Sequence, residues 1–203
     1  MPAVALPARN QEQTERHYTL EEFLAGEFDE KVELVDGEII PMGYTNIIHA
    51  ALVSWLSHIL RTWSDQHDWG LILSGDAGVL TKPATETRRD TARGADLICI
   101  SFERYKSVAQ KGKLIDCGPE VIIEVVSPSN TWNNINDKLV EYFDIGTNEI
   151  WVVSPDHLSI AVYATKKSSQ SYSAEDSDVL TSQQLPGFEL QLSQLADEVA
   201  RLV

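Results

Sequence analysis

The sequence predicts an α/β domain in which helices flank a central mixed β-sheet. A run of mostly β-branched residues over 121–126 is typical of a strand buried on both faces. An amphipathic stretch over 133–145 follows it and predicts a helix, with Gly146 placed to end it. A second apolar strand over 149–154 completes a strand–helix–strand crossover. Such a crossover joins parallel strands, whereas the hairpins found elsewhere in the chain join antiparallel ones.

The elements before this crossover follow from local patterns. Thr19 and Glu22 form a capping box, which predicts a short helix through about Ala25. Asp36-Gly37 is a strong hairpin signal. The same kinds of signal predict strands over 31–35 and 38–41, an amphipathic helix over 46–67, strands over 70–73 and 78–81, a charged loop over 82–94, a strand over 95–100 and a polar excursion over 103–118.

The elements after the crossover are fewer. A strand over 159–165 is joined to the preceding one by a Pro-Asp turn. The stretch 168–178 is polar and predicts a flexible segment, and a closing helix is expected within 190–202. With 203 residues, the chain is expected to form one domain over 18–203 after a flexible lead-in over 1–17.

Composition excludes several classes of protein. Hydrophobic residues make up 43% of the chain and charged residues 23%, which are globular values and exclude a wholly disordered chain. There is no signal-peptide pattern and no apolar run of the roughly 20 residues that span a bilayer, so no membrane association is expected. The chain has two cysteines, which give no disulfide framework, and we expect a cytoplasmic location.

The charge distribution bears on the substrate. The net charge is -15, whereas a protein that binds nucleic acid usually shows a basic surface. The segment 82–113 is different, because it holds eight basic and four acidic residues. Arg88, Arg89 and Arg93 lie in it and are candidates for contacts with an anionic substrate. A solvated loop surface explains the same charges equally well.

Two acidic residues in apolar strands are the strongest functional signal. Glu124 interrupts the β-branched run, and a buried carboxylate there must be paired, protonated or bound to a cation. Asp96 opens the apolar strand before it. Together the two carboxylates and a backbone carbonyl, that of Val125, could hold Mg²⁺, which keeps several of its waters. The alternatives for Glu124 are a structural buried ion pair, or a side chain that reaches the end of the sheet.

Other polar residues could complete such a site. Glu33 could supply a third carboxylate, or it could be a solvent-facing strand residue. Lys138 and Tyr142 share one helix face with Asn134, and a lysine there could stabilise charge on a phosphate. An ordinary surface lysine paired with Asn134 or Glu141 is the alternative. His49, at the start of the long helix, could cap it, pack, or enter the site and contact the substrate.

Several motifs together resemble the bacterial Uma-two family of restriction-endonuclease-like proteins. The resemblance extends from about residue 18 to residue 200. It rests on the segments Glu33–Ile39, Pro119–Ser129, Asp137–Tyr142, Glu149–Val153 and Leu185–Phe188, together with a histidine at the position of His49.

This resemblance implies a restriction-endonuclease-like core of the PD-(D/E)XK nuclease superfamily. Asp96 is then the first acid and Glu124 the second. The sequence departs from the usual pattern twice: Ala95 replaces a proline, and Val126 stands where the superfamily has its lysine. In the Uma-two family the role of that lysine has moved to the following helix, where Lys138 stands.

The sequence thus leads us to expect a Mg²⁺-dependent endonuclease that hydrolyses DNA, in which Mn²⁺ can replace Mg²⁺. Nucleases that cut both strands of a duplex commonly work as dimers, so a homodimer is expected. Two alternatives stay open at this point. One is a non-catalytic binding or assembly module on a nuclease-like fold, because fold does not imply function. The other is a metal-dependent hydrolase of a different phosphoester.

Overall fold

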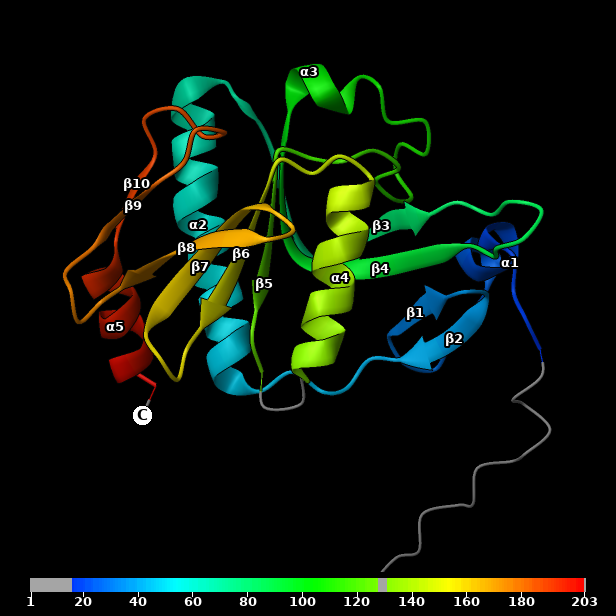
Figure 1. Cartoon of the computed structure of the whole chain (residues 1–203), viewed down its shortest axis with the longest axis horizontal. Coiled ribbons are helices and arrows are strands. Elements are labelled where there is room, and N and C mark those ends of the chain that lie inside the picture. Colours follow the sequence, from blue (N-terminus) through cyan, green and yellow to red (C-terminus); the bar gives the residue numbers. More distant parts are fainter. Residues whose placement is uncertain (1–15, 128–130, 203) are drawn as a thin grey trace, which may run out of the picture.

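The computed structural model describes residues 16–127 and 131–202, and its centre is an eight-stranded mixed sheet (Figure 1). The neighbouring strands follow the order β2-β1-β4-β5-β6-β7-β8, and β3 pairs with β4 outside this path. The strands are β1 (Val32–Val35), β2 (Glu38–Pro41), β3 (Gly70–Lys82), β4 (Thr91–Ser101), β5 (Val121–Val125), β6 (Glu149–Ser154), β7 (Ser159–Thr165) and β8 (Ser168–Ser173). A separate pair is formed by β9 (Val179–Thr181) and β10 (Glu189–Gln191).

Helices lie on both faces of the sheet, as the fold class predicts (Figure 1). On one face, α2 and the closing helix α5 bury their apolar side chains against alternate residues of the central strands. On the other face, α4 does the same with the intervening residues. The helices are α1 (Leu20–Ala25), α2 (Ile47–His67), α3 (Phe102–Tyr105), α4 (Trp132–Asp144) and α5 (Leu192–Ala200).

The crossover β5–α4–β6 forms as the sequence predicts. Strands β5 and β6 are parallel, with Val121 opposite Glu149 and Val125 opposite Val153. Helix α4 begins after Thr131, whose side chain accepts from the N–H of Asn134. Because side chains alternate along β5, Ile123 packs toward α2 whereas the residues on either side of it face α4. This alternation directs the Glu124 side chain toward α4.

Strand β4 holds a central position in the sheet, because three strands pair with it. It pairs with β3 along most of its length, with β1 at Ala92, and with β5 over Leu97–Cys99. A hairpin closed by Asp36 and Gly37, both at positive φ, places β1 there. The acidic residues of β1, β4 and β5 are thereby brought to one region of the sheet.

The structure corrects three predictions of secondary structure and adds a pair of strands. The two strands expected over 70–73 and 78–81 are the single strand β3, which continues through a bulge where Gly75 and Asp76 have positive φ. The charged loop expected over 82–94 ends earlier, since 91–94 belong to β4. The polar segment expected to be flexible forms β8 over 168–173, and the β9–β10 pair was not expected.

The remaining predictions of secondary structure agree with the structure. The capping box of Thr19 and Glu22 opens α1, and Gly146, at a φ of 91°, follows the end of α4. Within the described part of the chain, no helix is both long and apolar enough to cross a bilayer. Of the expected lead-in over 1–17, all but residues 16 and 17 lie outside the described residues.

Candidate active site

A pocket of about 440 Å³ opens where the β1–β2 hairpin, the first turn of α2 and the first half of α4 meet. It is lined by the acidic residues predicted from the sequence to form a site, and by residues of the hairpin and of the connection to α2. The lining residues are Glu33, Val35, Ile40, Pro41, Met42, Gly43, Tyr44, Thr45, His49, Asp76, Arg93, Asp96, Glu124, Ser127, Asn134, Asp137 and Lys138.

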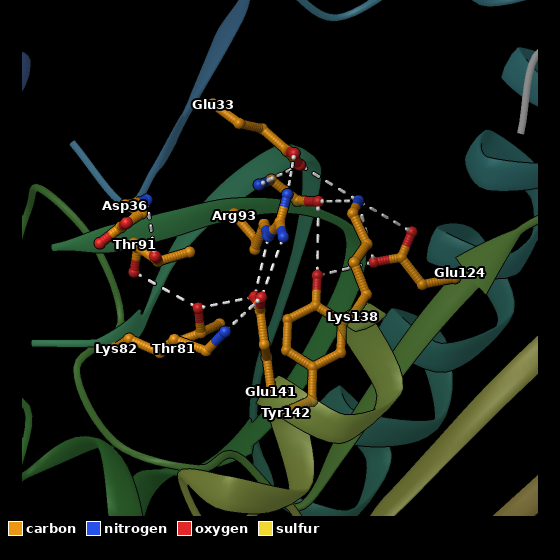
Figure 2. Close-up of polar contacts among 11 residues, drawn as sticks. Glu33, Asp36, Thr81, Lys82, Thr91, Arg93, Glu124, Lys138, Glu141 and Tyr142 are labelled. Atoms are coloured by element: carbon orange, nitrogen blue, oxygen red, sulfur yellow. Dashed lines mark hydrogen bonds and ion pairs between the residues drawn. The ribbon is translucent and has the colours of Figure 1, made fainter. Parts of the chain in front are cut away.

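Glu124 lines this pocket, and its side chain points toward Lys138 and Tyr142 of α4 (Figure 2). The hydroxyl of Tyr142 donates a hydrogen bond of 2.7 Å to its Oε1. The Nζ of Lys138 lies 3.4 Å from its Oε2 and 3.5 Å from its Oε1. Burial raises the pKa of Glu124 to about 7, an effect that Lys138 opposes and that the negative charge of Asp96 reinforces. Burial therefore makes this carboxyl harder to ionise than an ordinary glutamate.

Asp96 is on β4, which pairs with the strand that carries Glu124. Its Oδ2 accepts a 2.7 Å hydrogen bond from the backbone N–H of Val125 and lies 3.1 Å from Nε2 of His49. His49 is held in place because its own backbone N–H is capped by the side chain of Asn46. Burial alone would lower the pKa of His49, but the hydrogen bond and charge of Asp96 outweigh burial and raise it. His49 thus lines the pocket as the partner of Asp96.

Lys138 lies between two carboxylates. Its Nζ is 3.2 Å from Oε1 of Glu33 and 3.4 Å from Oε2 of Glu124, and it donates to the carbonyl of Gly94 at 2.8 Å. Burial alone would lower the pKa of Lys138, but the charges of the two glutamates raise it above its ordinary value, so the ammonium stays charged. The alternative of a surface lysine paired with Asn134 or Glu141 is therefore wrong.

Glu33 is the third carboxylate of the pocket. Its side chain is 9% exposed, so the alternative of a solvent-facing strand residue is wrong. It accepts from the backbone N–H of Gly94 at 3.0 Å and from Nη1 of Arg93 at 3.1 Å (Figure 2). These contacts hold the carboxylate in the position where it also meets Lys138.

Glu141 was not predicted to take part, yet it anchors Arg93. The guanidinium of Arg93 donates to both carboxylate oxygens of Glu141, at 2.8 and 2.9 Å, and Lys82 and Thr81 donate to the same carboxylate (Figure 2). The spacing of Glu141, three residues after Lys138 on α4, places both on one helix face and was the signal available in the sequence. The resulting chain of charges runs from Glu141 through Arg93 to Glu33.

The pairing of Glu141 predicts how stability depends on pH. Burial would raise its pKa, but hydrogen bonds from Arg93 and Lys82 outweigh burial and lower it to about 2. A carboxyl whose pKa is lower in the folded than in the unfolded protein stabilises the fold at any pH above its unfolded-state pKa. This contribution is lost as the pH falls from about 4.5 to about 2. As the pH falls across this range, the wild type should lose roughly 3 kcal/mol of unfolding free energy relative to Glu141→Gln.

Urea unfolding at a series of pH values measures this difference. Glu38→Gln, at an exposed position of β2, is the matched control and should give a small difference at every pH. A difference for Glu141→Gln that does not change with pH would contradict the assignment.

The three arginines named as candidate substrate contacts lie in different places. Arg93 lines the pocket, but its guanidinium is already engaged by Glu33 and Glu141. Arg88 donates to the carbonyl of Pro83 in an exposed turn, and the backbone N–H of Arg89 donates to Asp36. Neither Arg88 nor Arg89 is among the residues that line the pocket.

The donor set fits Mg²⁺ bound with its waters rather than a metal enclosed by side chains. Across residues 16–127 and 131–202, no group of three or more His, Cys, Asp or Glu side chains is arranged to hold a metal ion. Asp96 and Glu124 instead offer carboxylate oxygens from adjacent strands, with Glu33 nearby. Mg²⁺ is commonly held by one or two carboxylates together with waters and substrate phosphates. The chemistry of these donors therefore fits the metal expected from the sequence.

Comparison with solved structures supports the fold assignment. The crystal structure of "a putative nuclease belonging to DUF820" from Anabaena variabilis matches this chain with a TM-score of 0.74. The match covers 89% of this chain and 98% of that one, at 17% sequence identity. At this identity the likeness establishes a shared fold, that of a protein described as a nuclease.

Comparison with sequences gives the family. A search of curated proteins found no match. The model of the Uma2 family, described as "Putative restriction endonuclease", matches residues 20–193, which is most of the chain. Every segment named in the sequence analysis for its resemblance to this family lies within that match, which confirms the resemblance. The chain belongs to the Uma2 family.

Proposed function

We propose that this protein is a metal-dependent endonuclease that hydrolyses phosphodiester bonds of DNA. The observation that carries the proposal is the position of Lys138, whose Nζ lies between the buried carboxylates of Glu33 and Glu124, beside Asp96. Four side chains from three strands and one helix thus meet in one pocket. Family membership and the nuclease-like fold support nuclease chemistry as the use of this arrangement.

Asp96 and Glu124 are the proposed ligands of Mg²⁺ or Mn²⁺, with the carbonyl of Val125 as a backbone ligand. When bound, such an ion polarises the phosphate and lowers the pKa of a bound water. Glu33 would help to hold the ion, either directly or through a water. The backbone N–H of Val125 and the ring of His49 hold Oδ2 of Asp96, so they fix the direction of this carboxylate.

Lys138 and Tyr142 supply the other half of the chemistry. The charged ammonium of Lys138 stabilises the negative charge that develops on the phosphate in the transition state. Tyr142 donates to Glu124 at 2.7 Å and keeps that carboxylate facing the lysine. Lys138 thereby takes over the role of the lysine that is absent at position 126. His49 lines the pocket and is a proposed contact of the substrate.

We further propose a homodimer in the cytoplasm. Nucleases that cut both strands of a duplex commonly work as dimers, and a pair of identical chains would supply one active site for each strand.

A cleavage assay with the full wild-type chain tests the proposed function. We expect nicking or linearisation of plasmid DNA with Mg²⁺ or Mn²⁺, abolished by excess EDTA and restored by adding the metal back. If the folded protein binds DNA but does not cleave it with either metal, the result would contradict the proposed nuclease and favour a non-catalytic binding module on this fold.

A further inference from the structure

Arg93 lines the pocket, but all three nitrogens of its guanidinium are held by carboxylates of the protein (Figure 2). Nε and Nη2 donate to the two oxygens of Glu141, at 2.8 and 2.9 Å, and Nη1 donates to Oε2 of Glu33 at 3.1 Å. The Arg93 side chain is 13% exposed, so it has little access to water. Its hydrogen bonds therefore depend on these two carboxylates.

The two oxygens of Glu33 have different partners. Oε2 accepts from Arg93, whereas Oε1 accepts from the backbone N–H of Gly94 at 3.0 Å and lies 3.2 Å from Nζ of Lys138. The position of Lys138 between Glu33 and Glu124 thus requires that Arg93 leave Oε1 of Glu33 free.

Glu141 is the residue that limits Arg93 to one oxygen of Glu33. A guanidinium and a carboxylate commonly form two parallel hydrogen bonds, and in this protein Glu141 receives that pair. Without the carboxylate of Glu141, two buried nitrogens of Arg93 would lack acceptors, which is costly. Glu33 is the other carboxylate that Arg93 contacts. We expect the guanidinium to turn to both oxygens of Glu33 and to displace Lys138 from Oε1.

We propose that Glu141 is a positioning residue of the active site, which holds two nitrogens of Arg93 and so leaves one oxygen of Glu33 for Lys138. Glu141 is buried and is not among the residues that line the pocket, so it acts through Arg93 and Glu33. The inference rests on the proposed function and adds a residue to it. It also assigns Arg93 to the carboxylates of the protein and not to the substrate.

The first test is the kinetics of Glu141→Gln. The amide keeps the size of the side chain but turns an N–H group toward the guanidinium. We expect kcat for plasmid cleavage with Mg²⁺ to fall at least about tenfold, because Lys138 is misplaced. KM should stay unchanged, because Glu141 does not touch the substrate. Circular dichroism under the assay conditions shows that the variant is folded.

Lys82→Met is the matched control. Nζ of Lys82 donates to the same carboxylate at 2.9 Å, but Lys82 does not line the pocket and does not contact Arg93 or Glu33. We expect this variant to lose stability and to keep the wild-type kcat. A loss of kcat equal to that of Glu141→Gln would mean that Glu141 only fastens α4 to β3, and the inference would fail.

A second substitution separates positioning from a purely structural role. In Glu141→Gln/Arg93→Met no guanidinium competes for Glu33, so most of the lost kcat should return. Removing both partners of a buried ion pair also avoids leaving one charge unpaired. If Arg93 binds DNA, or if Glu141 only supports the fold, the double variant will cleave no faster than Glu141→Gln, which would overturn the inference.

A crystal structure of Glu141→Gln without metal gives a readout that does not depend on cleavage. We expect both oxygens of Glu33 to accept from Arg93, and the 3.2 Å contact between Glu33 and Lys138 to be lost. An unchanged Glu33 and Lys138 would refute the positioning role. If the wild type cleaves no DNA, the proposed function fails, and this structure still decides whether Glu141 controls the partners of Glu33.

Discussion

Asp96→Asn is expected to reduce Mg²⁺-dependent cleavage to below about 1% of the wild-type rate. Asparagine keeps the size of the side chain and can still accept the hydrogen bond that the N–H of Val125 gives to Oδ2 of Asp96. It loses the negative charge, and a neutral amide oxygen is a weak ligand for a hard divalent cation. The loss should therefore fall on cleavage and not on folding.

Initial rates of plasmid nicking, with thermal unfolding measured in parallel, check this prediction. Asp65→Asn is the matched control, because Asp65 is 67% exposed and pairs with Arg61 on the outer surface of α2. It should cleave as well as the wild type. Retained cleavage by a folded Asp96→Asn protein would remove Asp96 from the site.

Lys138→Met is expected to slow cleavage by at least about 100-fold. Methionine fills much of the same volume but leaves the carboxylates of Glu33 and Glu124 without the cation that lies between them. Their mutual repulsion then raises the pKa of Glu124 further above the value of about 7 that it has beside Lys138.

The pH dependence of cleavage separates the raised pKa of Glu124 from the loss of the Lys138 charge at the phosphate. Glu124 must be ionised to bind a cation, so activity should rise with pH through the titration of this carboxyl and reach half its maximum at or below pH 7 in the wild type. In Lys138→Met the residual activity should have its midpoint at a higher pH. Lys106→Met, at a position with a 74% exposed side chain, is the control and should change neither the rate nor the midpoint. An unchanged profile in Lys138→Met would contradict the coupling between Lys138 and Glu124.

The part of the site that could be predicted from the sequence is the part set by local pattern. A glutamate inside the β-branched run over 121–126 is expected to lie largely out of solvent, and the side chain of Glu124 is 13% exposed. The crossover carries α4 back over the sheet, and the helical spacing of Lys138 and Tyr142 then places both against Glu124. In these cases short-range periodicity determines which way a side chain points.

The part that could not be predicted depends on partners distant in the sequence. Arg93 lies in a charged stretch without apolar alternation, so the sequence predicts a loop there, whereas pairing with β3 places Arg93 in β4. Its partner Glu141 is 48 residues away, and no local signal joins the two. Strand β8 is polar and exposed over most of its length, so pairing with β7 defines it rather than any hydrophobic pattern.

Titration calorimetry of Mg²⁺ tests the central claim most directly. The wild type and the double variant Asp96→Asn/Glu124→Gln would each be titrated, first alone and then with DNA, and plasmid cleavage would be followed in parallel. We predict that the wild type binds the metal and cleaves, and that the folded double variant does neither. A folded wild type that binds no Mg²⁺ even with DNA present would contradict the account, because the carboxylates of Asp96 and Glu124 would then be structural.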